Sequence, residues 1–375
     1  MVDIFILFPI TSSINNILPV SLNRVLLLLF IILLIFRQLC HGKIYKRSVC
    51  TLMFVAFFSA NGIILTKEMS LNIENCIYWV TTIIVLLYIS YRENRIALVK
   101  EFQKRQRFIG ISAAITILIN LIGFFVGSSF EATGAYRGFM VTSHSMASTM
   151  ILGMALLLLY PKNKFHVIAV LLETLILFAT EARTFMLPLA VLLYFELRLW
   201  VRDGKRRKFI IVCFMILVVL VLPYTGMAKK FVETLNNPYA VDWLSGLTNF
   251  RSTLWEGDIC RFMTEPMYYK LFGNGFSYTY ELHNELYGMK IWSHNDFFNL
   301  LIAVGVVGVI CYLYILCSTI RRLHREHQSL FYTMLFSGMI FGTAFFNGFY
   351  LYIALVFAFT ILAISPNITK TSDAS

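Results

Sequence analysis

The amino-acid sequence predicts an all-α polytopic membrane protein with about eleven or twelve transmembrane helices and one large extracytoplasmic loop. Of its 375 residues, 58% are hydrophobic and only 14% are charged, whereas average soluble chains are roughly 45–50% apolar and roughly 25% charged. Apolar runs of membrane-spanning length recur along the chain, and basic residues fall in alternate connections between them. These observations exclude a soluble globular domain, a disordered chain and a secreted disulfide scaffold.

About eleven apolar segments meet or approach the roughly 20 residues that a helix needs to cross a bilayer. They are predicted at residues 22–39, 48–66, 74–91, 108–127, 142–160, 165–181, 184–199, 209–225, 297–320, 330–347 and 349–365. The opening segment, residues 4–19, is apolar but contains Pro9, Pro19 and two asparagines, so it is either a twelfth span or an interfacial helix. We expect no removable signal peptide, because the N-terminus lacks a basic region and a small-residue cleavage site.

The basic residues predict the orientation of these spans. Lys and Arg gather in the connections at 37–47, 91–107 and 198–208 and thin out in the connections between them. Because cytoplasmic loops hold the excess of Lys and Arg, these connections are expected in the cytoplasm. A twelfth span at 4–19 would place both termini there, which we favour. The net charge of +12 is therefore explained by membrane topology, and we expect no nucleic-acid partner.

The spans divide the chain into three parts. Residues 1–225 contain the first eight or nine spans, residues 226–293 form an extracytoplasmic loop, and residues 294–375 contain the last three spans and a short cytoplasmic tail. The loop is rich in Tyr, Trp and Phe, which a plain linker would not need. We expect it to fold into short helices that lie on the membrane and roof a cavity.

No metal or cofactor is predicted. The seven cysteines are scattered without a CxxC motif or a Cys/His pairing, so neither a disulfide framework nor a zinc site is indicated. The extracytoplasmic segments hold no paired carboxylates of the DxD kind. We therefore expect a reaction that is independent of metal.

Three extracytoplasmic residues stand out as candidates for chemistry: Arg183 in FATEARTFM, Arg251 in NFRSTLWEGDI and His294 in IWSHNDFFNLL. Each also has a structural explanation. Arg183 could snorkel at the membrane surface, Arg251 could pair with a nearby carboxylate, and His294 could begin a helix-capping cluster with the residues that follow it.

Taken together, the three residues suit a lipid diphosphate at the membrane surface. Arg stays protonated and binds phosphate bidentately, so Arg183 and Arg251 could stabilise a departing diphosphate. His294 could accept the proton of an attacking sugar hydroxyl, because the pKa of His is ordinarily near 6.5. Weaker candidates, for substrate binding, are Arg137, Trp255, Asn295 and His283.

Four sequence motifs within residues 137–320 resemble the bacterial O-antigen polymerase (Wzy) and O-antigen ligase superfamily. They are the turn TEARTFMLP, the segment RSTLWEGDI, the following LFGNGF, and the helix start SHNDFFNLLIAVGVVGV. The resemblance implies a C-type glycosyltransferase fold of about twelve spans that uses undecaprenyl-pyrophosphate-linked oligosaccharides outside the bacterial inner (plasma) membrane. Arg183 and Arg251 match the family's phosphate-binding arginines and His294 its essential histidine, whereas Ala182 replaces a serine that the family usually has.

The resemblance leaves two activities open. A polymerase would transfer the growing chain of an O antigen or capsule onto another lipid-linked repeat unit. A ligase would deliver it to a lipid A core or another acceptor, as in lipopolysaccharide assembly. We favour the polymerase, because the sequence shows nothing specialised for another acceptor. A flippase or other transporter is disfavoured, because few charges lie within the spans. A chain-length regulator and a separate flippase are expected as partners by resemblance only, together with membrane lipid.

Overall fold

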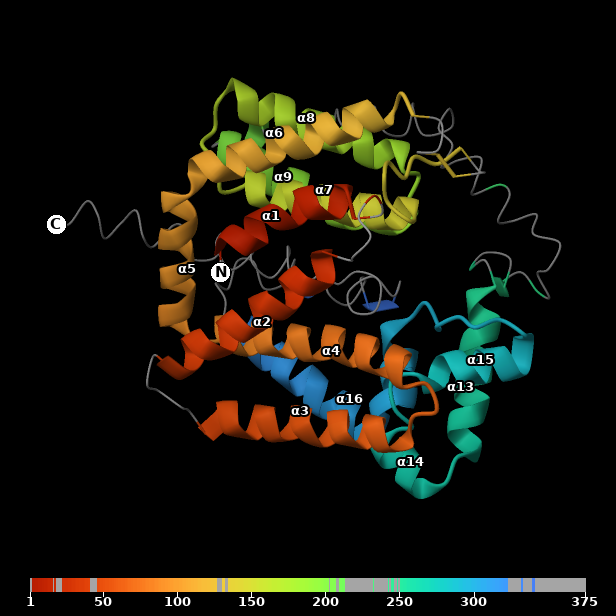
Figure 1. Cartoon of the computed structure of the whole chain (residues 1–375). Coiled ribbons are helices and arrows are strands. Elements are labelled where there is room, and N and C mark those ends of the chain that lie inside the picture. The colour runs from red at the N-terminus through yellow and green to blue at the C-terminus, as the bar shows by residue number, and fades with distance from the viewer. Residues whose placement is uncertain are drawn as a thin grey trace. The chain divides into compact units, whose positions relative to one another are not determined.

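The computed structural model describes helices and a few turns of this chain (Figure 1). The described residues are 2–15, 17, 22–40, 46–126, 130–131, 134–201, 203–206, 209–212, 232, 242, 244–245, 248, 250–322, 332 and 339–340. They contain no β-strand, and only one isolated bridge joins Phe130 to Tyr136. The chain divides into two compact units, which are described separately below.

The first unit comprises residues 1–30, 96–234 and 357–375. Its described helices are α1 (Val2–Ser13), α6 (Gln106–Gly123), α7 (Ser143–Leu157), α8 (Lys164–Ala179) and α9 (Met186–Trp200). Helix α1 packs against α6 and α7, and its Ile6 carbonyl accepts a hydrogen bond from the hydroxyl of Ser112 at 2.6 Å. Its Phe5 and Phe8 are buried. The opening segment is thus a 12-residue helix in the core of this unit.

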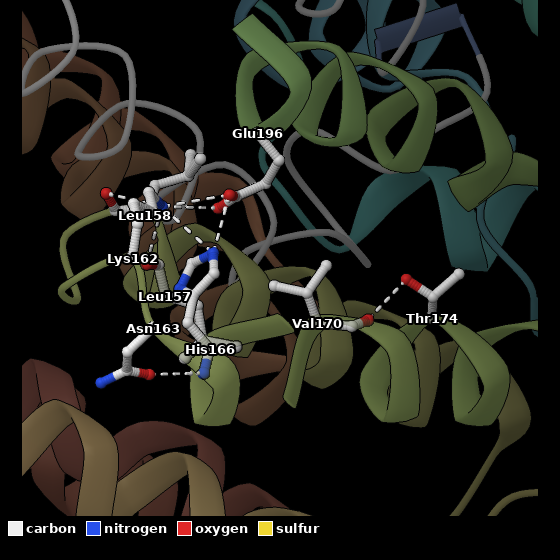
Figure 2. A network of polar contacts seen from close by, with 8 residues as sticks. All are labelled: Leu157, Leu158, Lys162, Asn163, His166, Val170, Thr174 and Glu196. Atoms are coloured by element: carbon white, nitrogen blue, oxygen red, sulfur yellow. Dashed lines mark hydrogen bonds and ion pairs between the residues drawn. The ribbon is translucent and has the colours of Figure 1, made fainter. Parts of the chain in front are cut away.

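A buried polar cluster joins the start of α8 to the last part of α9. Arg183 lies at the other ends of these two helices, in the turn between them. Figure 2 shows Lys162, His166 and Glu196 pointing toward one another. The Lys162 ammonium lies 3.0 Å from the Glu196 carboxylate, and His166 Nε2 lies 2.8 Å from the same oxygen. Asn163 caps α8 by accepting the amide hydrogen of His166 at 2.9 Å. The Glu196 carboxylate is thus paired with both Lys162 and His166, which offsets the cost of burying its charge.

The second unit comprises residues 31–95 and 235–356. Its described helices are α3 (Lys46–Leu65), α4 (Met69–Ile89), α13 (Arg251–Thr264), α14 (Met267–Phe272), α15 (Tyr278–Tyr287) and α16 (Asp296–Ile320). Helix α16 packs against α3, α4 and α14. Two helices cross the division between the units: α2 (Leu22–Cys40) and α5 (Arg92–Lys104).

The chain is an all-α polytopic membrane protein. Four described segments are long and apolar enough to cross a membrane, at Ser48–Leu65, Met69–Ile89, Gln106–Gly123 and Asp296–Ile320. The predicted spans at 142–160, 165–181 and 184–199 correspond to the shorter helices α7, α8 and α9. Most of the predicted span 209–225, nearly all of 330–347 and all of 349–365 lie outside the described residues. The total of eleven or twelve spans therefore stays a prediction.

One expected loop is a helix. Residues 91–107 were expected as a basic connection, but residues Arg92–Lys104 form α5. The segment lacks Gly and Pro, and Leu98, Val99 and Phe102 are spaced so that one face of the helix is buried. The Arg95 guanidinium donates to the carbonyl of Ile89 at 2.8 Å, which satisfies an otherwise unpaired group at the end of α4. Counting the basic residues of the segment predicts the side of the membrane on which it lies, but it does not detect this helical periodicity.

The loop after α14 forms hydrogen bonds with α16 at a break in that helix. Gly305 interrupts α16 with φ 65°, which leaves two carbonyl groups of the preceding turn without helical partners. The amide of Asn274 donates to Ile302 O at 2.9 Å, and that of Gly275 donates to Ala303 O at 3.0 Å. Gly273 and Gly305 both have positive φ, and a β-carbon on either would overlap the opposing backbone. Gly273 of LFGNGF and Gly305 of AVGVVG are therefore explained by the close packing of two backbones.

Candidate functional site

His294 lies at the turn that begins α16. The next residue, Asn295, is the N-cap, and its Oδ1 accepts the amide hydrogens of Phe297 at 2.9 Å and Phe298 at 3.4 Å. His294 itself has a left-handed backbone with φ 52°. Its ring lies against the buried Trp292 indole, with ring centroids 4.3 Å apart. Asn295 therefore forms the helix cap that the sequence allowed, while the His294 side chain is only partly buried.

Arg251 is the first residue of α13, a helix that contacts the His294 turn through Trp255. Trp255 lies four residues after Arg251, one helical turn further along α13. Its indole Nε1 donates to the carbonyl oxygen of Ser293 at 2.8 Å, next to His294 in the chain. Two of the three predicted catalytic residues thus lie on segments that contact each other within the second unit.

His283 is engaged within the protein on both sides of its ring. Nδ1 lies 2.9 Å from the carbonyl oxygen of Ile291, which can only accept, so Nδ1 carries a hydrogen. Nε2 lies 3.1 Å from the carboxylate of Asp258, and both side chains are almost fully buried. This pair joins α13 to α15. The arrangement favours a structural role for His283 over the substrate-binding role expected of it.

Arg183 lies in the first unit, in a single 3₁₀ turn, η2 (Arg183–Phe185), between α8 and α9. Its side chain is largely exposed. Partial burial lowers its pKa from the ordinary value, but an arginine starts so high that it stays charged. His144, at the start of α7, lies near this turn, because its ring centroid is 6.3 Å from that of Phe185.

Arg137 lies in the same unit as Arg183, on the segment that precedes α7. The amide of the neighbouring Tyr136 donates to Ala179 O at the end of α8 at 2.9 Å. The Arg137 guanidinium reaches Val141 O at 3.4 Å. This segment is therefore anchored to the end of α8, a few residues before Arg183.

Left-handed backbone occurs at one predicted catalytic position and within two residues of the other two. Among the described non-glycine residues, the ones with positive φ are Glu181 (53°), Phe250 (69°) and His294 (52°). Glu181 precedes Arg183 by two residues, Phe250 directly precedes Arg251, and the third residue is the predicted base itself. Such conformations are uncommon for residues with side chains, and they concentrate at functional sites, where the surrounding structure holds them.

Sequence reasoning missed Asn299. Its Oδ1 accepts the amide hydrogen of Ser293 at 3.1 Å, and its side chain is fully buried. The available signal was its position four residues after Asn295, which places a second amide side chain one turn further along the same helix. No group of three His, Cys, Asp or Glu that could hold a metal ion is found in the part of the chain that the structure describes.

Comparison with known proteins gives one match. Residues 167–313 match the family model described as O-antigen ligase, Wzy_C, and this range includes Arg183, Arg251 and His294. No curated protein and no solved structure matches the chain. The resemblance expected from the four motifs is confirmed by the family match. The match over residues 167–313 supports the superfamily of O-antigen polymerases and ligases as the family that this part of the chain resembles.

Proposed function

We propose that this protein is a polymerase of surface-polysaccharide repeat units. It transfers a glycan from undecaprenyl pyrophosphate onto the non-reducing end of another lipid-linked repeat unit. The family match supports polymerase or ligase chemistry in general. The observation that carries the assignment of the site is the left-handed backbone at His294 and within two residues of Arg183 and Arg251.

In the proposed reaction, the acceptor hydroxyl attacks the anomeric carbon of the donor sugar. His294 accepts the proton of that hydroxyl as the new glycosidic bond forms. The bond between the anomeric carbon and the diphosphate oxygen breaks, and the electron pair leaves with the diphosphate. Arg183 and Arg251 stabilise the charge that develops there. This chemistry proceeds on the extracytoplasmic face and needs no metal in the roles given to these residues.

A ligase would use the same donor and the same three residues with a different acceptor. Deleting the gene separates the two activities. Loss of a polymerase leaves lipid-linked single repeat units, whereas loss of a ligase leaves long lipid-linked chains that are not attached to lipid A core. We favour the polymerase because the sequence shows nothing specialised for a separate acceptor.

The direct test uses purified protein in detergent with lipid-linked repeat units extracted from the deletion strain. The wild-type protein is expected to produce a ladder of longer glycans without an energy source. His294→Ala and Arg251→Ala are expected to lower the rate by about 100-fold or more, because each removes a group that acts mainly in the transition state.

Arg261→Ala is the matched control for charge. It removes an arginine from the same helix as Arg251, and this arginine pairs with Glu285 at 2.7 Å on the surface. Its rate is expected to stay within about twofold of wild type. Normal polymerisation by folded His294→Ala and Arg251→Ala proteins would show that the site is wrongly assigned. A wild-type protein that moves the substrate across liposomes without lengthening it would instead identify a transporter.

A further inference from the structure

The residue before His294 is held at both of its backbone polar groups. Ser293 is fully buried. Its amide donates to Asn299 Oδ1 at 3.1 Å, and its carbonyl oxygen accepts from the Trp255 indole at 2.8 Å. These bonds fix the two peptide groups that flank Ser293, and the second of them leads directly into His294. The strained backbone of His294 is thus maintained by two side chains from different parts of the fold.

Trp255 also contacts the chain on the other side of His294. Its ring stacks on that of Phe298, with centroids 5.8 Å apart and planes 26° from parallel. One side chain therefore bonds to the residue before His294 and packs against the first turn of the helix after it. Because Trp255 projects from the second turn of α13, it also ties the helix that begins with Arg251 to this turn.

The contacts of Trp255 argue against a direct role in binding sugar. Its single polar group, the indole N–H, is used by a buried carbonyl oxygen of the protein. Removing the Trp255 indole would leave the buried carbonyl oxygen of Ser293 without a hydrogen-bond donor, which would lower the stability of the fold. Its ring is occupied on the side of Phe298.

The geometry points to Trp255 as a positioning residue that sets His294 and Arg251 relative to each other, with Asn299 holding the other side of Ser293. This inference rests on the proposed function for the part that concerns catalysis. A misplaced base slows the chemical step more than it weakens binding, and a displacement of about 1 Å can cost about 100-fold in rate.

The test compares Trp255→Phe with Tyr287→Phe. The first keeps an aromatic ring against Phe298 but removes the donor to Ser293. The second is the matched control, because it removes a hydroxyl that donates to Thr253 O on the same helix at 2.8 Å, at the α13–α15 contact. For Trp255→Phe, kcat is expected to fall about 10- to 100-fold with KM for lipid-linked repeat units within about twofold. For Tyr287→Phe, kcat is expected to stay within about twofold of wild type.

A second readout does not depend on activity. Hydrogen exchange measured by mass spectrometry is expected to accelerate at least about tenfold in peptides covering residues 292–299 of Trp255→Phe, and not in those of Tyr287→Phe. Asn299→Ala removes the acceptor of the Ser293 amide and is expected to accelerate hydrogen exchange in the same peptides. This variant provides the test if Trp255→Phe does not fold. Unchanged exchange in that segment, or a raised KM with an unchanged kcat, would overturn the positioning role. A wild-type protein without transferase activity would instead refute the proposed function, and the exchange measurement would still decide the inference.

Discussion

At the scale of single residues, the left-handed conformation is the feature with the clearest energetic consequence. It costs a residue with a β-carbon roughly 1–2 kcal/mol relative to the right-handed one. Glycine has no such cost. His and Asn adopt it more readily than most other residues, whereas it is a real outlier for a bulky residue such as Phe250. Glu181 and Phe250 therefore store more strain than His294 does.

Because of this strain, we expect glycine to give a more stable protein than alanine at position 181, the reverse of the usual order within a helix. Both Glu181→Ala and Glu181→Gly remove the side chain and its contacts, but only glycine relieves the backbone at φ 53°. We expect the glycine variant to be more stable than the alanine variant by about 1 kcal/mol, measured by thermal unfolding in detergent. At Glu256, which is exposed inside α13, the order should be the usual one, with alanine above glycine. The same order at both positions would mean that Glu181 is not strained.

Deprotonation of the Tyr136 hydroxyl is expected to lower the free energy of unfolding in alkaline solution. Its hydroxyl donates to Asn120 O at 2.5 Å, and burial raises its pKa from 10.0 to about 12. Because the folded protein holds this proton more tightly than the unfolded chain does, the stabilisation is fully present below pH 10 and is lost as the pH rises from 10 to 12. Wild type is expected to lose roughly 2 kcal/mol more than Tyr136→Phe over this interval. Equal losses in denaturant titrations of the two proteins would contradict the prediction.

At the scale of elements, the contact between α14 and the broken helix α16 depends on the absence of side chains. Asn61 of α3 adds to it, because its side-chain amide donates to Phe272 O at 3.1 Å and its oxygen accepts from the Tyr268 hydroxyl at 2.7 Å. The loop after α14 is thereby held between α3 and α16. Any atom added at the glycine contact must displace backbone rather than a flexible side chain.

Two glycines with the same backbone conformation separate packing from strain. Gly305 has φ 65° and lies against the backbone of Leu271, whereas Gly288 has φ 67° and nothing close to its position. Gly288→Ala is expected to cost about 1 kcal/mol, from strain alone. Gly305→Ala is expected to cost at least about 3 kcal/mol, because it also forces two elements apart. Thermal unfolding and the yield of monodisperse protein measure the difference, and similar costs at both positions would refute the close contact.

At the scale of the whole molecule, the residues predicted for catalysis and for substrate binding are divided between the two units. Arg183 and Arg137 belong to the first unit, and Arg251, Trp255 and His294 belong to the second. The proposed reaction requires both arginines of the catalytic set to act on one diphosphate. This requirement predicts that Arg183 and Arg251 lie close together, whatever sugar the substrate carries.

Cysteines placed beside the two arginines should cross-link. The variant carries Thr184→Cys and Ser252→Cys in a background where the exposed Cys50 and Cys260 are replaced by alanine. A short bifunctional maleimide is expected to join the two new cysteines in membranes, detected after proteolysis by mass spectrometry. Thr184→Cys with Lys100→Cys is the control, because Lys100 is exposed on α5, which is expected on the cytoplasmic side. Absence of the first cross-link, with both cysteines accessible, would contradict a shared diphosphate site.

The sequence alone determined the class of the protein and the approximate positions of the apolar helices within the part of the chain that the structure describes. A long run of apolar residues has few stable alternatives to a helix in a bilayer, because every backbone group must be satisfied internally. The predicted spans at 48–66 and 297–320 therefore agree closely with α3 and α16. The candidates Arg183, Arg251 and His294 also came from the sequence, because their residue types suit the proposed chemistry and their order resembles that of the family.

The tertiary structure decided how those residues are held. Nothing in the local sequence indicates that Trp255 reaches the carbonyl of Ser293, or that the loop after α14 fills the break in α16. Both contacts join segments far apart along the chain, and their energy depends on burial and on which partner satisfies which polar group. Periodicity and composition report the preferences of one segment at a time, whereas the strain at His294 is maintained only by its neighbours in space.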